Sequence, residues 1–80
     1  VIGEERVPLT RLEFDLLRYL ILREGKAVPR TDLLADVWGY TYEGDSNVIE
    51  VAVRSLRRKL GARSGSLETI RGIGYRYRRG

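Results

Sequence analysis

The residues best suited to chemistry lie between positions 47 and 60, where arginines are interspersed with aliphatic side chains. Guanidinium groups bind phosphate oxygens and guanine edges, and small apolar groups pack against thymine methyls. At about 100° per residue, a helix through this segment has two distinct sides. One side is an apolar stripe formed by Ile49, Val53, Leu56 and Leu60. The other carries Asn47, Val51, Arg54, Ser55 and Arg58, with Val48 on one flank and Arg57 on the other.

The cationic side is unusual because it includes Val51, which an ordinary solvent-facing helix surface would not place among arginines. One interpretation is that Val51 covers a neighbouring loop. A helix lying in the major groove of DNA accounts for the whole set, because that groove requires cations and methyl-binding groups together. The assigned contacts are thymine methyls for Val48, Val51 and Ala52, base edges for Asn47 or Arg58, and phosphates for Arg54 and Arg57.

A second cationic feature is the pentapeptide Arg71-Gly72-Ile73-Gly74-Tyr75. Residues 67–71 and 75–78 are predicted to form the two strands of a hairpin, with a turn through residues 72–74. Glycines permit a close backbone approach, and an arginine at the tip of a hairpin suits insertion into a minor groove. Glycine-rich turns are common, so this segment alone is a weak signal. After a basic helix, it predicts the second half of a DNA clamp.

The distribution of charge favours a polyanionic partner. The chain has 15 basic and 11 acidic residues, a formal net charge of +4. Residues 1–53 contain six basic and ten acidic residues, whereas residues 54–80 contain nine basic residues and one acid, Glu68. A solvated face or a disordered tail is the alternative, but leucines, isoleucines and tyrosines recur among these arginines at regular spacing.

Enzymatic chemistry is poorly supported. The sequence has no histidine and no cysteine, which removes the usual general base, the thiol nucleophile and most transition-metal ligands. Acids such as Glu43 and Asp45 lie in a loop without an evident pocket. No cofactor or metal is therefore expected. A protein-interaction domain whose basic face meets an acidic partner remains the alternative, and duplex titration would distinguish it from a DNA-binding domain.

The upstream half of the 80-residue chain is expected to form two helices of a single domain. Thr10 and Glu13 make a capping box at the start of the first helix, and Gly25 ends it. Its buried side is predicted to consist of Leu12, Leu16, Leu17, Leu20 and Ile21. Pro29 is placed in the first turn of a shorter helix over residues 30–38.

The connecting segments follow from turn-forming residues. Residues 40–46 are predicted to be a loop, and Asp45 or Ser46 is the expected N-cap of the helix over residues 47–60. Gly61 ends that helix, and residues 61–66 are expected to be a flexible linker. Residues 1–7 look like the remnant of a strand. No apolar run approaches the roughly 20 residues that a membrane span requires.

The order of these elements resembles the OmpR/PhoB-type winged-helix effector domains of two-component response regulators. The matching segments are Leu9-Thr10…Glu13-Phe14-Asp15-Leu16-Leu17, Asp32-Leu33-Leu34…Val37-Trp38-Gly39, Val48-Ile49-Glu50-Val51…Val53-Arg54…Leu56-Arg57-Arg58-Lys59-Leu60 and Thr69-Ile70-Arg71-Gly72-Ile73-Gly74-Tyr75-Arg76. The resemblance implies an α+β winged helix-turn-helix fold with three helices, a C-terminal hairpin wing over residues 67–79 and a truncated N-terminal antiparallel strand or sheet. It also implies that the chain is a cytoplasmic phosphorelay fragment lacking its receiver domain.

By the same resemblance, the helix over residues 47–60 is the recognition helix, and two copies bind tandem half-sites on double-stranded promoter DNA. The implied contacts are Asn47, Val48, Val51, Ala52, Arg54, Ser55 and Arg57 in the helix, and Thr69, Arg71, Gly72 and Tyr75 in the wing. The loop that contains Tyr40, Tyr42, Glu43 and Asp45 is a candidate for contact with RNA polymerase, although Tyr40 and Tyr42 could instead pack against the domain. Ala52 and Ser55 depart from the polar or basic residues that many relatives carry, which leaves the target sequence open.

Overall fold

The first helix, α1 (Arg11–Ile21), begins at the predicted capping box. In the computed structural model, which describes residues 8–39, 42, 44 and 47–79, the Thr10 hydroxyl accepts from the Glu13 N–H, and the Glu13 carboxylate accepts from the Thr10 N–H. The prediction that Gly25 ends the helix is wrong, because α1 stops at Ile21. Gly25 instead has a φ of 87° in the following turn, and its N–H donates to the carbonyl of Tyr77. The turn after Ile21 thus places Gly25 beside the last residue of the strand that ends at Tyr77.

The buried side of α1 is narrower than its leucine pattern predicts. Leu16, Leu17 and Leu20 belong to the core, whereas Leu12 and Ile21 are each 41% exposed. Both exposed residues lie at the ends of the helix, where fewer neighbouring elements cover it. Glu13, a charged residue, is buried in their place.

A short strand, β1 (Val28–Pro29), precedes the second helix and was not predicted. It pairs antiparallel with β3 (Gly74–Tyr77), Pro29 lying opposite Gly74, and β3 pairs with β2 (Leu67–Ile70), so that the strand order is β1-β3-β2. Pro29 therefore precedes α2 (Arg30–Leu33) instead of lying in its first turn. The helix continues as the π-helical segment η1 (Leu34–Trp38) and ends at Gly39, whose N–H donates to the carbonyl of Leu34.

The third helix, α3 (Val48–Leu60), confirms the predicted apolar stripe. Ile49, Val53, Leu56 and Leu60 are all buried. The prediction that Asp45 or Ser46 is the N-cap is wrong, because Asn47 occupies that position, without a side-chain capping bond. Asp45 and Ser46 themselves lie outside the described residues. Gly61 has a φ of 58° directly after the helix, in agreement with its predicted role as a stop.

The segment after α3 is not the flexible linker that its glycines and serines suggested. Residues Gly61–Ser66 form a 3-10 helix, η2, which leads directly into β2 and places Leu67 in the core. The predicted hairpin is confirmed, with its turn one residue earlier than expected because Gly74 begins β3. The predicted strand over residues 1–7 lies outside the described residues.

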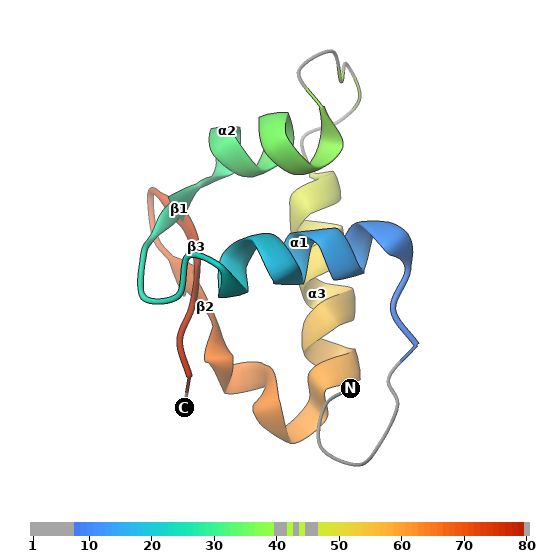
Figure 1. Ribbon diagram of the computed structural model, residues 1–80, viewed down its shortest axis with the longest axis vertical. Coiled ribbons are helices and arrows are strands. Elements are labelled where there is room, and N and C mark those ends of the chain that lie inside the picture. Colours follow the sequence, from blue (N-terminus) through green and yellow to red (C-terminus); the bar gives the residue numbers. More distant parts are fainter. Residues whose placement is uncertain (1–7, 40–41, 43, 45–46, 80) are drawn as a thin grey trace.

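These elements arrange around a single core. Figure 1 shows α1 crossing α3 at a steep angle, with the three strands gathered on one side of the two helices. The core is formed by side chains from α1, β1, α2, α3, β2 and β3. Within the described part of the chain, no helix combines the length and the apolar character that crossing a membrane requires. The packing leaves one side of α3 uncovered.

Candidate nucleic-acid interface

The uncovered side of α3 carries four of the five residues that helical projection placed there, all but Ser55. Asn47, Arg54 and Arg58 are exposed, and Val51 is 57% exposed. Because Val51 is so open, the interpretation that it covers a neighbouring loop finds no support among the described residues. Anchored by its buried stripe, α3 presents two cations and an apolar side chain together to the outside.

A groove of about 550 Å³ runs beside this side of α3. The start of α1 and Trp38 form one wall, and α3 forms the other. The α3 wall consists of Val48, Val51, Ala52, Arg54, Ser55 and Arg58. Val48 and Ala52 are half-buried and pack against the core cluster, so they line the groove without projecting from it.

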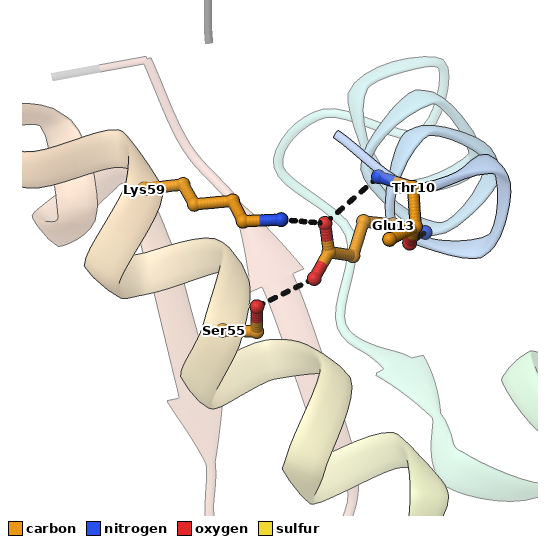
Figure 2. Close-up of polar contacts among 4 residues, drawn as sticks. All are labelled: Thr10, Glu13, Ser55 and Lys59. Carbon is orange, nitrogen blue, oxygen red and sulfur yellow. Dashed lines mark hydrogen bonds and ion pairs between the residues drawn. The ribbon is translucent and has the colours of Figure 1, made fainter. Parts of the chain in front are cut away.

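Ser55 is turned toward α1. Figure 2 shows its hydroxyl, together with the ammonium group of Lys59, directed at the carboxylate of Glu13. The Lys59 Nζ atom lies 2.6 Å from Glu13 Oε1, and the Ser55 hydroxyl donates to Oε2. Burial alone would raise the pKa of Glu13, but the hydrogen bonds from Lys59, Ser55 and the Thr10 backbone, with the charge of Lys59, lower this pKa to about 2. Sequence reasoning found the capping role of Glu13 but not this link between α1 and α3.

Arg57 is also engaged within the domain. Its Nε and Nη2 atoms donate to the carbonyl of Leu67 at 3.1 and 2.8 Å, and Nη2 donates to the Thr69 hydroxyl at 2.7 Å. The side chain is half-buried between α3 and β2. The structure thus places two predicted DNA contacts, Arg57 and Thr69, in contact with each other.

The tip of the hairpin is open. Arg71 and Gly72 are exposed, and Gly72 has a φ of 77° that a side chain would strain. Tyr75 lies differently, because its side chain is only 5% exposed and its ring belongs to the core. The pKa of Tyr75 is raised, mainly by burial and further by the neighbouring Glu50 carboxylate. Of the four predicted wing contacts, Thr69 and Tyr75 are thus hydrogen-bonded to other parts of the domain. Arg71 and Gly72 are exposed, and the described hydrogen bonds include none from the Arg71 side chain.

An ion pair that the sequence did not reveal joins α2 to α3. Arg30 Nε and Nη2 donate to the two oxygens of Glu50 at 2.8 and 3.0 Å, and the Tyr75 hydroxyl donates to Glu50 at 3.3 Å. The hydrogen bonds from Arg30 are the main reason that the pKa of Glu50 lies below its ordinary value. Three residues distant in sequence meet here, and no local motif signals such a contact.

The loop between η1 and α3 is only partly described. Tyr42 is half-buried, and its N–H donates to the carbonyl of Gly39. The other candidates for contact with RNA polymerase, Tyr40, Glu43 and Asp45, lie outside the described residues.

In the described part of the chain, three helices, of which α3 has an uncovered cationic side, and an antiparallel hairpin define a winged-helix domain. Comparison with known proteins gives the family: residues 3–77 match the family described as "Transcriptional regulatory protein, C terminal", and the chain belongs to it. One relative, the transcriptional regulatory protein PrrA of Mycobacterium leprae, is 46% identical over 71 residues, covering 86% of this chain and 30% of PrrA. The chain spans about a third of the length of the curated relatives it matches.

Solved structures agree with this classification. The DNA-binding domain of Bacillus subtilis CssR superposes with a TM-score of 0.77 at 44% identity, covering 89% of this chain and 78% of that one. The Klebsiella pneumoniae RstA DNA-binding domain, solved in complex with the RstA box, superposes with a TM-score of 0.81 at 33% identity, covering 95% of this chain and 78% of that one. The family and these neighbours are domains of transcription regulators rather than enzymes.

Proposed function

We propose that this domain binds double-stranded DNA sequence-specifically, with α3 in the major groove and the tip of the hairpin in the adjacent minor groove. The observation that carries the proposal is the open position of Val51 beside the exposed Arg54 and Arg58, on a helix whose opposite side is fixed in the core. Thymine methyls and phosphates lie side by side along a major groove, so this combination of side chains is complementary to DNA. The related RstA DNA-binding domain was solved in complex with the RstA box, which supports DNA binding by this domain.

The proposed contacts follow from exposure. Arg58 and Asn47 reach base edges, Arg54 contacts phosphate, and Arg71 enters the minor groove, where narrow A·T-rich segments attract arginine. Val51 contacts thymine methyls at the open rim, and Val48 and Ala52 extend this apolar surface along the groove wall. Ser55 and Tyr75 support the surface from within, because both hydroxyls donate to carboxylates of the domain.

The test is a titration of labelled duplexes, both a sequence selected from a random pool and unselected sequences, at several salt concentrations. Arg58→Ala and Arg71→Ala should each weaken binding by about 1–3 kcal/mol. Arg58→Ala should also relax base preference, and Arg71→Ala should lower the salt slope by about one unit. Val51→Ala should change base preference without changing the slope, since it removes no charge. Arg18→Ala is the matched control, because it removes an equivalent exposed arginine from α1. Equal, weak binding of all duplexes would instead favour an acidic protein partner.

The wider role that we propose is that of the output domain of a cytoplasmic response regulator. In the full-length protein, a phosphorylatable receiver domain would control the assembly of two copies on tandem half-sites about one helical turn apart. Tyr40, Tyr42, Glu43 and Asp45 would form the loop that contacts RNA polymerase. Replacing Tyr42 should then lower transcription from a target promoter while leaving duplex affinity unchanged.

A further inference from the structure

The contacts of Arg57 differ from those of the other arginines on α3. Arg54 and Arg58 are exposed, whereas Arg57 directs two of its nitrogen atoms at a single carbonyl and one of them also at a neighbouring hydroxyl. A planar guanidinium that is bonded in this way is held in one orientation. Its acceptors, Leu67 and Thr69, both belong to the first strand of the wing.

Among the described residues, the carbonyl of Leu67 accepts from the side chain of Arg57 and not from a neighbouring strand. In the order β1-β3-β2, β2 is an edge strand whose carbonyls point alternately toward β3 and away from it. The carbonyl of Ser66 accepts from Arg78, and that of Ile70 accepts from Ile73, so these two point into the hairpin. By alternation the carbonyl of Leu67 points outward, toward α3. Arg57 therefore satisfies an edge acceptor that would otherwise lack a partner.

A second contact fixes the sheet to α3 two turns earlier. Glu50 accepts from the hydroxyl of Tyr75 on β3 and is itself held by Arg30. Glu50 and Arg57 are seven residues apart, which places them on the same side of the helix and about 10 Å apart along its axis. One contact would fix a position, but two contacts separated along the helix also fix the angle between the wing and α3.

On this geometry, and resting on the proposed function, we propose that Arg57 is a positioning residue that pins the wing to the recognition helix rather than a phosphate contact. The distance from Val51 and Arg58 to Arg71 is then set before DNA arrives. A clamp that is already ordered loses less conformational freedom on binding, so the contact made by Arg71 depends on the bonds made by Arg57.

A double-mutant cycle of Arg57→Ala and Arg71→Ala on the selected duplex tests the proposal. Arg71→Ala should weaken binding on the order of tenfold and lower the salt slope by about one unit. We expect Arg57→Ala to have a similar effect on affinity and on the salt slope. The double variant should bind DNA with about the affinity of whichever single variant binds more weakly, because both changes remove the same minor-groove contact. Losses that multiply, with a slope lowered by about two units, would overturn the proposal, since they would identify Arg57 as a separate phosphate contact.

Arg57→Gln provides a variant in which charge and positioning are separated. Glutamine has no charge but keeps an N–H donor for the Leu67 carbonyl. We expect Arg57→Gln to bind the selected duplex clearly more tightly than Arg57→Ala does. Equal losses of affinity in the two variants would contradict a positioning role. Urea unfolding of each free domain shows whether it is folded under the binding conditions. If Arg71→Ala has no effect, the proposed function itself fails; if Arg71→Ala weakens binding and Arg57→Ala simply adds to it, only the positioning role fails.

Discussion

Glu13 shows how one side chain can serve two structural purposes. Its carboxylate accepts from the Thr10 N–H at the start of α1 and from Ser55 and Lys59 on α3, and the residue is only 6% exposed. Removing a charge from water is costly unless the charge is paired and hydrogen-bonded, and here every oxygen has a donor. The helix α3 is therefore held against α1 by a polar contact at the edge of the core.

We expect Glu13→Gln to destabilise the domain by about 1–3 kcal/mol at neutral pH, because the amide has one acceptor oxygen where the carboxylate has two, and the ion pair with Lys59 is lost. With a pKa of about 2 in the folded chain, against an ordinary value of 4.5, the ionised carboxylate stabilises the fold above pH 4.5. This contribution is lost as the pH falls from about 4.5 toward 2. Urea unfolding at pH 7, 4 and 2.5 should show the difference between parent and variant shrinking with acidification.

The control for this change is Asp15→Asn on the same helix. Asp15 pairs with Arg11 at 3.5 Å on the surface, where ion pairs contribute no more than about 1 kcal/mol. A small effect is expected for this variant. A Glu13→Gln deficit that stayed constant down to pH 2.5 would show that the ionised form of Glu13 is not what stabilises the contact.

At the scale of elements, the close contact of β1 with β3 depends on Gly74. A Cβ atom at this position would lie 2.0 Å from the carbonyl oxygen of Val28 and 2.9 Å from the nitrogen of Arg30. Both are backbone atoms, which cannot move aside without separating the two strands. The sheet thus joins the wing to the helical part of the domain at a point where only glycine fits.

Gly74→Ala should therefore cost about 2–4 kcal/mol of unfolding free energy, measured by urea denaturation, because overpacking against backbone is poorly relieved. Gly65→Ala is the matched control, since an added Cβ at Gly65 meets nothing within 4 Å. We expect this second change to alter stability by no more than about 0.5 kcal/mol. Similar losses in both variants would mean that the close approach of β1 is not what excludes a side chain at position 74.

The sequence predicted the elements whose signal is local. The periodic leucines of α1, the buried stripe of α3 and the glycine turn of the hairpin each carry their pattern in consecutive residues. The strand β1 did not, because two residues become a strand only when β3 lies beside them. The π-helical segment η1 after α2 and the 3-10 helix η2 after α3 were not predicted either, because no local pattern in their residues distinguishes them from an α-helix or a loop.

The residues of the candidate site were likewise predicted where the signal is local and missed where it depends on distant partners. Helical projection identified the open side of α3, including Val51 and Arg58, from spacing alone. The inward bonds of Ser55, Arg57 and Tyr75 could not be predicted in this way, because their partners lie 42, 10 and 25 residues away in the chain. A side chain that a helical projection places on the open side can thus be hydrogen-bonded within the fold.

At the scale of the whole molecule, charge is divided along the chain. Residues 1–53 carry a net charge of −4 and residues 54–80 a net charge of +8. Folding pairs some of these charges across the division, as in Lys59 with Glu13 and Arg79 with Glu24. Among the cations that remain exposed, Arg54 and Arg58 lie on α3 and Arg71 at the tip of the wing, while others, such as Arg11, Arg18 and Arg23, lie on α1 or just after it. The exposed arginines of α3 and the wing contribute a positive field at the surface where we propose that DNA binds.

Glu68, the one acid among residues 54–80, offers a test of this field. It lies 2.7 Å from Arg76 and 3.4 Å from Arg78, and these ion pairs keep its pKa below the ordinary value. Glu68→Gln releases both guanidinium groups beside the wing, so we expect about two- to fivefold tighter binding of selected and unselected duplexes alike and a steeper salt slope. Base preference should not change, because phosphate contacts carry no sequence information. Asp15→Asn adds the same charge on α1 and should give a smaller gain; equal gains would mean that net charge, and not the placement of cations around the wing, governs the encounter with DNA.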